Sequence, residues 1–309
     1  MNLKQLAQKE NKYFAPGHRA CAGCGFPTIV RAILKASEDP VVVSSATGCL
    51  EVVSTIYPFT AWKVPFVHSA FENSAATISG VEATFQAWKR QNKMDQHVNF
   101  VAFGGDGGTY DIGLQSLSGA LERGHDFLYV CYDNEAYMNT GIQRSGATPF
   151  GASTTTTPAG KKVPGKMQKR KDLARIAAAH NIPYVAQASL SNLVDLTKKA
   201  EKAFSIRGPK VLVVLSPCNP GWNVPTDSML SISKSAVETC FWPLYEVEDG
   251  HKYTINYKPR EKKPIDEWLK NQRRFAHMLK PGNEWLLQEA QKQVDEEWGK
   301  LLKFAGETA

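Results

Sequence analysis

The chain has 309 residues, 42% of them hydrophobic, and a formal net charge of +7. It can bury a large core, and its apolar runs are far shorter than the roughly 18 residues of a membrane-spanning helix. The amino end is polar and lacks the apolar segment of a secretory signal, so we expect a cytoplasmic protein that does not enter a membrane. Two basic runs, 161–171 and 258–263, contain few aromatic residues, which favours solvated loops or partner docking over nucleic-acid binding.

Strand-like apolar runs alternate with helical stretches over residues 20–220. In chain order, we expect a helix over 26–36, a strand over 41–43, a helix over 72–88, a strand over 98–103, a helix over 111–123, a strand over 127–132, a helix over 172–180, a strand over 184–188, a helix over 191–204 and a strand over 211–215. This alternation predicts an α/β fold in which a doubly wound, mostly parallel sheet carries helices on both faces. A polar loop is expected over 140–171, and its part over 151–171 is long enough to be a functional lid or a disordered segment.

The character of the sequence changes after about residue 222, where proline, tryptophan and charged residues become frequent. Apolar residues three or four apart predict two amphipathic helices, within 263–279 and 283–302. We therefore divide the chain into a main domain over 1–225 and a C-terminal helical extension over 226–309. The extension is expected to pack on the main domain or on a partner subunit.

A glycine-rich stretch around one carboxylate carries the first functional signal. An apolar strand runs into Gly105, Asp106, Gly107 and Gly108, and the next strand ends just before Asn134. The carboxyl ends of parallel strands form the ligand-binding edge of an open α/β sheet, and Mg²⁺ prefers carboxylate and amide oxygens together with phosphate. Glycines let the backbone approach a phosphate and turn into a helix whose N-terminus favours anions. The stretch predicts a diphosphate held through a divalent cation; the alternative is an ordinary strand-to-helix turn, because a short glycine motif is weak evidence.

The cysteines carry the second functional signal, and they form two groups. Four lie in glycine-rich loops or just after apolar strands: Cys21, Cys24, Cys49 and Cys218. Four thiolates at one edge of a sheet suit either a zinc ion or an iron–sulfur cluster, and the spacing alone favours zinc at least as much. A disulfide framework would need an oxidising compartment, which nothing else in the sequence indicates. Cys131 and Cys240 lie among apolar residues and are expected to be buried as small hydrophobic side chains.

Six segments together resemble the β subunit of the 2-oxoacid:ferredoxin oxidoreductases, and most closely the pyruvate enzymes of the pyruvate synthase type. They are GHRACAGCG, ATGCLEVVS, TAWKVPFVHSAFENSAA, GGDGGTYDIGLQSLSGALERGHD, YDNEAYMNTGIQRSGATP and ETCFWPLYEVEDG. The GDG sequence followed by 26 residues and an asparagine also resembles the general thiamine diphosphate (ThDP) motif. That motif often carries a double asparagine where this chain has Asp133 and Asn134. The resemblance covers roughly residues 14–250 and implies a ThDP-binding type of α/β fold.

The resemblance implies one ThDP, one Mg²⁺ ion and one 4Fe-4S cluster as cofactors. The cofactor-binding residues that match the family are Thr47, Gly48, Gly105, Asp106, Gly107, Gly108, Asn134 and Asn139. Among them, Asp106 and Asn134 would ligate Mg²⁺ together with the backbone carbonyl of Ala136. Asn139 would face the diphosphate and the reactive carbon as a catalytic residue; the alternative is that it serves only as a turn residue.

The resemblance also implies a role for the cysteines. The cluster would be held by Cys21, Cys24, Cys49 and Cys218. The loop from Thr47 to Cys49 would lie between the cluster and ThDP. His18 and His68 are further candidates for the pocket, although a histidine beside apolar neighbours is more often structural.

The implied function is ThDP-dependent oxidative decarboxylation of pyruvate with coenzyme A to acetyl-CoA and CO₂, with electrons passing through the cluster to ferredoxin. The glutamate that activates ThDP and the substrate-binding arginine are expected in a partner α subunit, and the electron exit in γ/δ-type or ferredoxin-like subunits. Three alternatives stay open at this point. The substrate could be 2-oxoisovalerate, oxalate or 2-oxoglutarate; the chain could be a zinc-binding structural subunit; or it could belong to a non-redox ThDP decarboxylase or carboligase.

Overall fold

The computed structural model describes residues 2–307. Its centre is an eight-stranded sheet with the strand order β2-β1-β3-β4-β6-β5-β7-β8. The strands are β1 (Val41–Ala46), β2 (Phe66–Ser69), β3 (Asn99–Gly105), β4 (Leu128–Asp133), β5 (Tyr184–Ser189), β6 (Lys210–Leu215), β7 (Leu244–Glu248) and β8 (Lys252–Tyr257). The six strands β1 to β6 run parallel, whereas β7 pairs antiparallel with β5 and β8 pairs antiparallel with β7.

Successive side chains of the central strands enter two different cores, one on each face of the sheet. On β4, Tyr129 and Cys131 belong to one core and Val130 and Tyr132 to the other, as the two-residue period of a strand requires. Helices α4 (Ser74–Arg90), α5 (Leu114–Glu122) and α6 (Leu173–Ala178) contribute to the first core, and α2 (Phe26–Lys35) and α7 (Leu193–Ser205) to the second. The doubly wound, mostly parallel α/β fold is therefore confirmed.

The expected elements of the main domain are present with small shifts of their ends, and several short elements were missed. Strand β2 has four residues and α3 (Cys49–Ser54) has six, too few for a period to be visible in the sequence. Three further short elements are α1 (Leu3–Gln8), α8 (Asn219–Trp222) and a π-helical turn over Gly107–Asp111 that precedes α5. The polar loop over 140–171 is not wholly exposed, because residues 145–152 are all buried.

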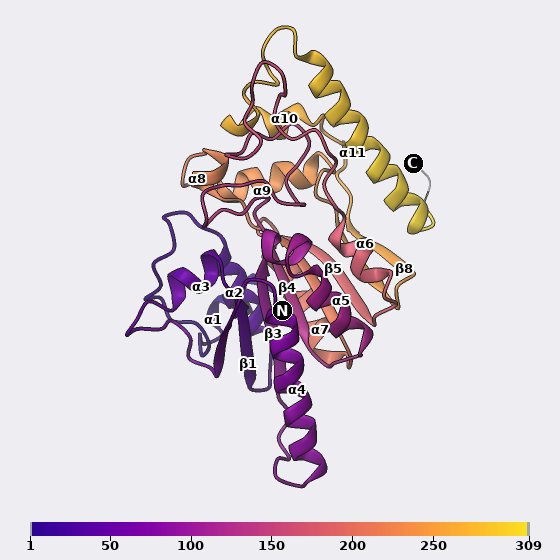
Figure 1. Ribbon diagram of the computed structural model, residues 1–309. Coiled ribbons are helices and arrows are strands. Elements are labelled where there is room, and N and C mark those ends of the chain that lie inside the picture. Colours follow the sequence, from indigo (N-terminus) through magenta and orange to yellow (C-terminus); the bar gives the residue numbers. More distant parts are fainter. Residues whose placement is uncertain (1, 308–309) are drawn as a thin grey trace.

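The C-terminal residues carry helices, as expected, and also two strands that the sequence analysis missed. The helices are α9 (Met229–Glu238), α10 (Asp266–Leu269) and α11 (Glu284–Phe304), and they gather in the upper half of Figure 1 above the sheet. Asp249 and Gly250 have φ angles of 51° and 75° and form the tight turn between β7 and β8, so the Asp-Gly pair was a hairpin signal. Residues of the extension share the first core with the parallel strands. The division at residue 225 stays a prediction.

The helix expected within 263–279 is interrupted. Helix α10 ends at Leu269, and after Gln272 a 3₁₀ turn over Arg273–Phe275 continues the chain. Gln272 has extended backbone angles of φ −127° and ψ 118°. The interruption turns the guanidinium of Arg274 into the interior, where the side chain is 7% exposed.

Candidate active site

Two adjacent strand ends position Asp106 and Asn134. Strands β3 and β4 pair in parallel with Gly105 opposite Tyr132, so the residues that follow both strands emerge at the same edge. The backbone N–H of Asn134 donates to Asp106 Oδ1 over 3.3 Å. Both side chains are buried at this edge. The structure thus brings together the carboxylate and the amide that the sequence placed on neighbouring strands.

Three candidate cation ligands converge at this point. One atom of the Asn134 side-chain amide lies 2.8 Å from Asp106 Oδ1 and 2.9 Å from the carbonyl oxygen of Ala136. Without a cation, the amide nitrogen occupies that position and donates to both oxygens. Two neighbouring ligands of an octahedral Mg²⁺ ion at about 2.1 Å are roughly 3 Å apart. With the amide oxygen turned inward, the set therefore has the donor chemistry and the spacing of one face of a Mg²⁺ site.

The Asp106 carboxylate lies almost fully inside the protein. Ser145 Oγ donates to its Oδ2 over 2.5 Å. Burial, and next the charge of Asp133, raise the pKa of Asp106 well above its usual range. A buried carboxylate with so little compensation favours a nearby positive charge. A divalent cation at the three oxygens would supply that charge.

The glycines of the turn leave no room for side chains. A Cβ on Gly107 would meet the ring of Tyr137 at 2.5 Å, and one on Gly108 would meet the backbone oxygen of Phe71 at 3.0 Å. The rings of Phe71 and Tyr137 stack at 5.6 Å beside the turn. Gly105 is close to Tyr132 in the same way. These glycines permit a close approach of the backbone, which is what a diphosphate cradle needs.

The loop at the end of β1 joins this edge. Gly48 is buried with φ 158°, and a Cβ there would lie 3.0 Å from Tyr132 Oη. Thr47 Oγ1 lies 2.8 Å from His68 Nε2, which in turn lies 3.6 Å from Glu51 Oε2. His68 therefore belongs to the wall formed by this loop.

The four loop cysteines are neighbours in space. Burial, and to a smaller extent the neighbouring thiols of Cys218, Cys49 and Cys21, raise the pKa of Cys24 to about 12. Burial and the thiols of Cys218 and Cys21 likewise raise the pKa of Cys49 to about 12. Within residues 2–307, however, no three His, Cys, Asp or Glu side chains stand at the spacing of a finished metal site. The structure gathers the four thiols without closing them around a centre.

Asn139 and Asp106 both lie close enough to the cysteines to shift their pKa values. The exposed Asn139 side chain lies near the Cys49 thiol and lowers its pKa, against the larger effect of burial, which raises it. The charge of Asp106 also raises the pKa values of Cys49 and Cys218, although less than burial does. Asn139 therefore lies where the cysteine loops meet the phosphate-type turn.

The other sequence candidates lie elsewhere. Cys131 and Cys240 are buried in the first core, as expected. The ring of His18 stacks on Phe14 at 5.5 Å, and its Nδ1 accepts the N–H of Ala20 over 3.4 Å. These contacts give His18 a structural role in the described chain.

A buried charge network behind the turn was not foreseen from the sequence. Asp133 and Glu135 are both fully buried. Arg170 Nη2 donates to Asp133 Oδ2 over 2.7 Å, and Arg274 Nη2 donates to Glu135 Oε2 over 2.5 Å. Burial raises the pKa values of both carboxyls, whereas the two arginines lower them. Asp133 and Glu135 flank Asn134 in the sequence, which was the only available signal.

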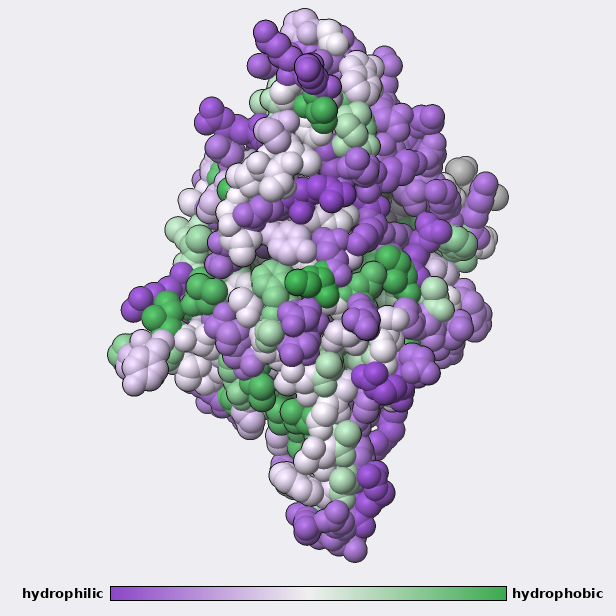
Figure 2. Space-filling model, viewed as in Figure 1, coloured by the Kyte–Doolittle hydropathy of each residue, from purple (hydrophilic) through white to green (hydrophobic). Residues whose placement is uncertain are grey.

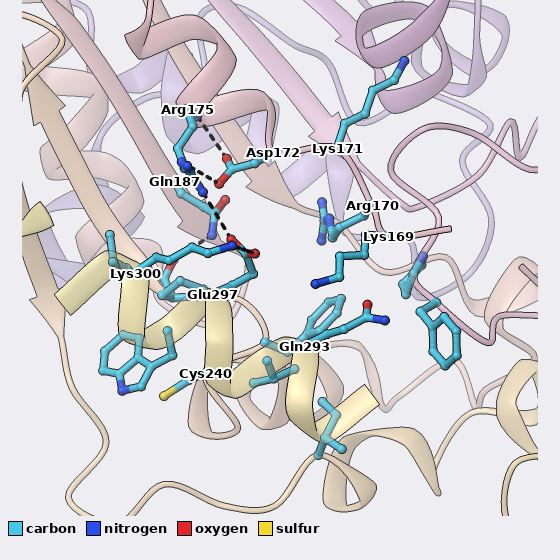
Figure 3. Close-up of a pocket in the computed structure, with 18 of the residues that line it drawn as sticks. Lys169, Arg170, Lys171, Asp172, Arg175, Gln187, Cys240, Gln293, Glu297 and Lys300 are labelled. Carbon is cyan, nitrogen blue, oxygen red and sulfur yellow. Dashed lines mark hydrogen bonds and ion pairs between the residues drawn. The ribbon is translucent and has the colours of Figure 1, made fainter. Parts of the chain in front are cut away.

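A partly open cavity of about 150 Å³ lies between α11 and the sheet (Figure 3). Arg170, Arg175, Glu297 and Cys240 are among the residues that line it, and Arg175 is paired with Glu297 at 3.2 Å across it. None of the predicted cofactor-binding residues and none of the four predicted cluster cysteines lines this cavity.

Comparison with known proteins agrees with this geometry. Residues 46–214, more than half of the chain, match the family "Thiamine pyrophosphate enzyme, C-terminal TPP binding domain". Pyruvate synthase subunit PorB of Methanocaldococcus jannaschii is 52% identical over 96% of this chain and 98% of its own length. The PorB subunit of Thermotoga maritima is 53% identical over 98% of this chain and 96% of its own length. Ketoisovalerate oxidoreductase subunit VorB of Pyrococcus abyssi is 45% identical over 96% and 94%, respectively.

A solved structure has the same fold. The 2-oxoglutarate:ferredoxin oxidoreductase from Magnetococcus marinus superposes with a TM-score of 0.57 at 20% identity, over 69% of both chains. In the described part of the chain, no helix has the length and apolar character needed to cross a bilayer. The ThDP-binding fold, the paired strand ends and the full-length similarity lead to one conclusion: the chain belongs to the PorB family of 2-oxoacid:ferredoxin oxidoreductase β subunits.

Proposed function

We propose that this chain is the β subunit of a pyruvate synthase. The reaction converts pyruvate and coenzyme A into acetyl-CoA, CO₂, one proton and two electrons, which leave one at a time for ferredoxin. The observation that carries the proposal is that the four loop cysteines lie beside Asp106 and Asn139, because this proximity joins the candidate diphosphate edge to the candidate cluster loops. An ordinary strand-to-helix turn at the glycines would not require four cysteines beside it.

The residues at the edge fit ThDP and Mg²⁺. Asp106 Oδ1, the Asn134 amide oxygen and the Ala136 carbonyl would hold Mg²⁺, and the glycine turn would lie against the diphosphate. Bound ThDP supplies the carbanion chemistry that allows a 2-oxo acid to lose CO₂. The protein positions the diphosphate, neutralises its charge through the cation, and keeps Asn139 beside the loop of Cys49.

The four cysteines fit a 4Fe-4S cluster. Soft thiolates suit such a cluster, and a ThDP enzyme that delivers single electrons needs an acceptor nearby. Burial raises the pKa values of Cys24, Cys49 and Cys218, so these thiols stay protonated until a metal binds. Cluster insertion would therefore release protons and draw the loops together. Zinc would suit the same thiols but would carry no electrons.

A partner α subunit would complete the site. Glu51 and Glu135, two buried glutamates near the edge, are already engaged: Thr55 Oγ1 donates to Glu51 Oε1 over 2.7 Å, and Glu135 is paired with Arg274. Neither is free to activate the ThDP ring. The α subunit would supply that carboxylate and the substrate-binding arginine, while γ/δ-type or ferredoxin-like subunits would pass electrons to ferredoxin.

The surface near α3 supports a partner. Four exposed apolar side chains gather in and after this helix and on β2: Val52, Tyr57, Phe59 and Val67. Figure 2 shows apolar surface across the middle of the molecule, at the level where the upper helices meet the sheet. Exposed apolar patches of this kind mark protein interfaces. We assign this surface to the α subunit because α3 begins at Cys49, beside the shared site.

The test is a substrate panel on the complex purified anaerobically with its partner subunits. Pyruvate should reduce ferredoxin or a viologen dye in the presence of coenzyme A, and metal analysis should find iron and sulfide rather than zinc. The VorB relative makes 2-oxoisovalerate the second candidate substrate. If kcat/KM is higher for 2-oxoisovalerate, 2-oxoglutarate or oxalate than for pyruvate, that acid replaces pyruvate as the proposed substrate. If the complex contains zinc and no iron, the proposed redox role is refuted.

A further inference from the structure

We infer that Arg274, from the C-terminal extension, is a positioning residue for the divalent cation of the ThDP site. The inference rests on the proposed function and extends it to a residue 139 positions away from the turn that it contacts. Arg274 would act by fixing the backbone that presents Asn134 and Ala136. It would also tie this backbone to the helix that follows Cys218.

The first step concerns Glu135, which lies between the two residues that present cation ligands. Its backbone has φ 70°, a conformation that non-glycine residues adopt only when their surroundings enforce it. Thr148 Oγ1 donates to its carbonyl over 2.6 Å, and its own N–H donates to Asp133 Oδ1 over 3.0 Å. Its side chain is paired most closely with Arg274, and more loosely with Arg170 at 3.4 Å. The amide and carbonyl on either side are thus fixed through Glu135.

Arg274 is itself held in place by Gln272 and Trp222. Gln272 Oε1 accepts from Arg274 Nε over 2.9 Å and from Nη2 over 2.7 Å. The guanidinium carbon lies 3.9 Å from the centre of the Trp222 ring, a cation–π distance. The planar guanidinium of Arg274 is therefore fixed in orientation. A lysine could not both donate two hydrogen bonds to Gln272 Oε1 in this geometry and stack on the Trp222 ring.

The third step connects the metal turn to a cluster loop. Trp222 Nε1 donates to the backbone carbonyl of Asn134 over 2.8 Å, and the Trp222 N–H donates to the carbonyl of Cys218 over 2.8 Å. Arg274 contacts both Trp222 and Glu135. One side chain thus braces the residues that present the cation ligands and the helix that begins just after Cys218.

A merely stabilising ion pair would not have this placement. Lys199 and Asp195 form such a pair within α7 at 2.7 Å, and Lys199 is 2% exposed. Its residues have no part in the predicted site. Loss of that pair should weaken the fold without changing the requirement for Mg²⁺. Loss of Arg274 should change that requirement, because a mobile Glu135 lets the Asn134 amide and the Ala136 carbonyl move apart.

The experiment measures the Mg²⁺ concentration that gives half-saturation with ThDP in the assembled complex, by calorimetric titration after removal of the cofactor with a chelator. Arg274→Met should raise this concentration at least about tenfold, and Arg274→Lys should raise it less. Arg273→Met changes the exposed neighbour of Arg274 and should leave the value unchanged, as should Lys199→Met. Glu135→Gln should resemble Arg274→Met, and the double variant should add little, because both changes weaken the Arg274–Glu135 pair.

Each outcome decides between two hypotheses. If wild-type complex binds ThDP without Mg²⁺, the proposed function fails. If the wild type needs Mg²⁺ and Asp106→Asn weakens binding, but Arg274→Met stays within about twofold of the wild type, only the role of Arg274 fails. If Arg274→Met does not assemble, Arg274→Lys decides: an unchanged Mg²⁺ requirement overturns the inference, and a raised one supports it.

Discussion

The Asn134 turn (residues 133–136) and the cysteine loops (the segments that carry Cys21, Cys24, Cys49 and Cys218) meet at one edge of the sheet but are built differently. All four residues of the turn are buried. Its two charged side chains, Asp133 and Glu135, accept hydrogen bonds from Arg170 and Arg274, respectively. The cysteine loops are more exposed: Cys21 lies at the surface, and the Cys218 sulfur accepts the N–H of Gly221 over a long 3.4 Å. The turn is preorganised by protein contacts, whereas the loops await the group that would organise them.

The difference predicts different consequences of losing a cofactor. After removal of Mg²⁺, Arg170 and Arg274 still bind the side chains of the turn, so the conformation of the turn should survive. Removal of the cluster leaves four thiols with no common partner, so the loops should become the first region to open. The following tests are ordered by the size of the expected effect.

The largest effect should come from removing the partner. The isolated chain should show an iron–sulfur spectrum but negligible oxidation of a 2-oxo acid, because it lacks the carboxylate that activates ThDP and the walls that exclude water. Activity should return when the α subunit is added, as measured by viologen reduction. Full turnover by the single chain would show that the edge is complete without a partner.

Loss of one cysteine should come next. Cys218→Ala removes a thiolate that water cannot replace without changing the cluster, so the broad absorption near about 400 nm should largely disappear. Cys21→Ala, Cys24→Ala and Cys49→Ala should behave alike. Cys131→Ala is the matched control and should keep the spectrum, because that thiol is buried in the core. Bleaching by the control and not by Cys218→Ala would exclude Cys218 as the fourth ligand.

Loss of the candidate Mg²⁺ carboxylate should have a smaller but clear effect. Asp106→Ala should weaken ThDP binding at least about tenfold, or roughly 1.4 kcal/mol, because the diphosphate loses part of its neutralisation. The iron–sulfur spectrum should persist. Asp111→Ala is the control. Asp111 lies on the same π-helical turn, but its carboxylate pairs with Lys171 at 2.7 Å and is not one of the three candidate Mg²⁺ ligands. Unchanged affinity in Asp106→Ala would refute the assignment of the turn.

The smallest effect concerns pH and the cluster-free protein. Burial raises the pKa values of Cys24 and Cys49 to about 12, from the value of 9.0 expected in an unfolded chain. Between these values the unfolded chain loses its thiol protons first, so the folded state binds more protons and its stability falls as pH rises. Urea unfolding between pH 8.5 and 10.5 should show a steeper decline for the wild type than for a Cys24→Ala, Cys49→Ala variant. Equal slopes would mean that these thiols are not buried without their cluster.

The parallel half of the fold could be predicted because its signal is local. The buried strands β1, β3, β4 and β6 are short apolar runs, and their order along the chain alternates with helices. The same locality made Asp106 and Asn134 visible as strand-end residues. The β7–β8 hairpin was missed because its strands mix polar and apolar residues and lie among charged segments.

The network behind the turn could not be predicted, because long-range contacts decide it. Arg274 lies in the sequence QRRFAH, whose basic pair reads as the solvated side of an amphipathic helix. In the structure, extended Gln272 breaks that helix, and the buried carboxylate of Glu135 receives the arginine. The free-energy cost of leaving the buried Glu135 carboxylate without its partner exceeds the helical preference of a few residues. No local pattern contains that information.

The position of β7 in the sheet has a consequence for how the chain is made. On a ribosome, β1 to β6 are complete once residue 215 has emerged, yet the outer edge of β5 stays unpaired until residues 244–248 arrive. An open edge of a buried parallel strand is a template for aggregation. Glu135 also waits, with its charge uncompensated by Arg274, for a residue synthesised 139 positions later. The nascent subunit thus passes through a period in which most of it is translated, but the edge of β5 is unpaired and the Asn134 turn cannot yet receive a metal. A chaperone would protect the chain most in that interval.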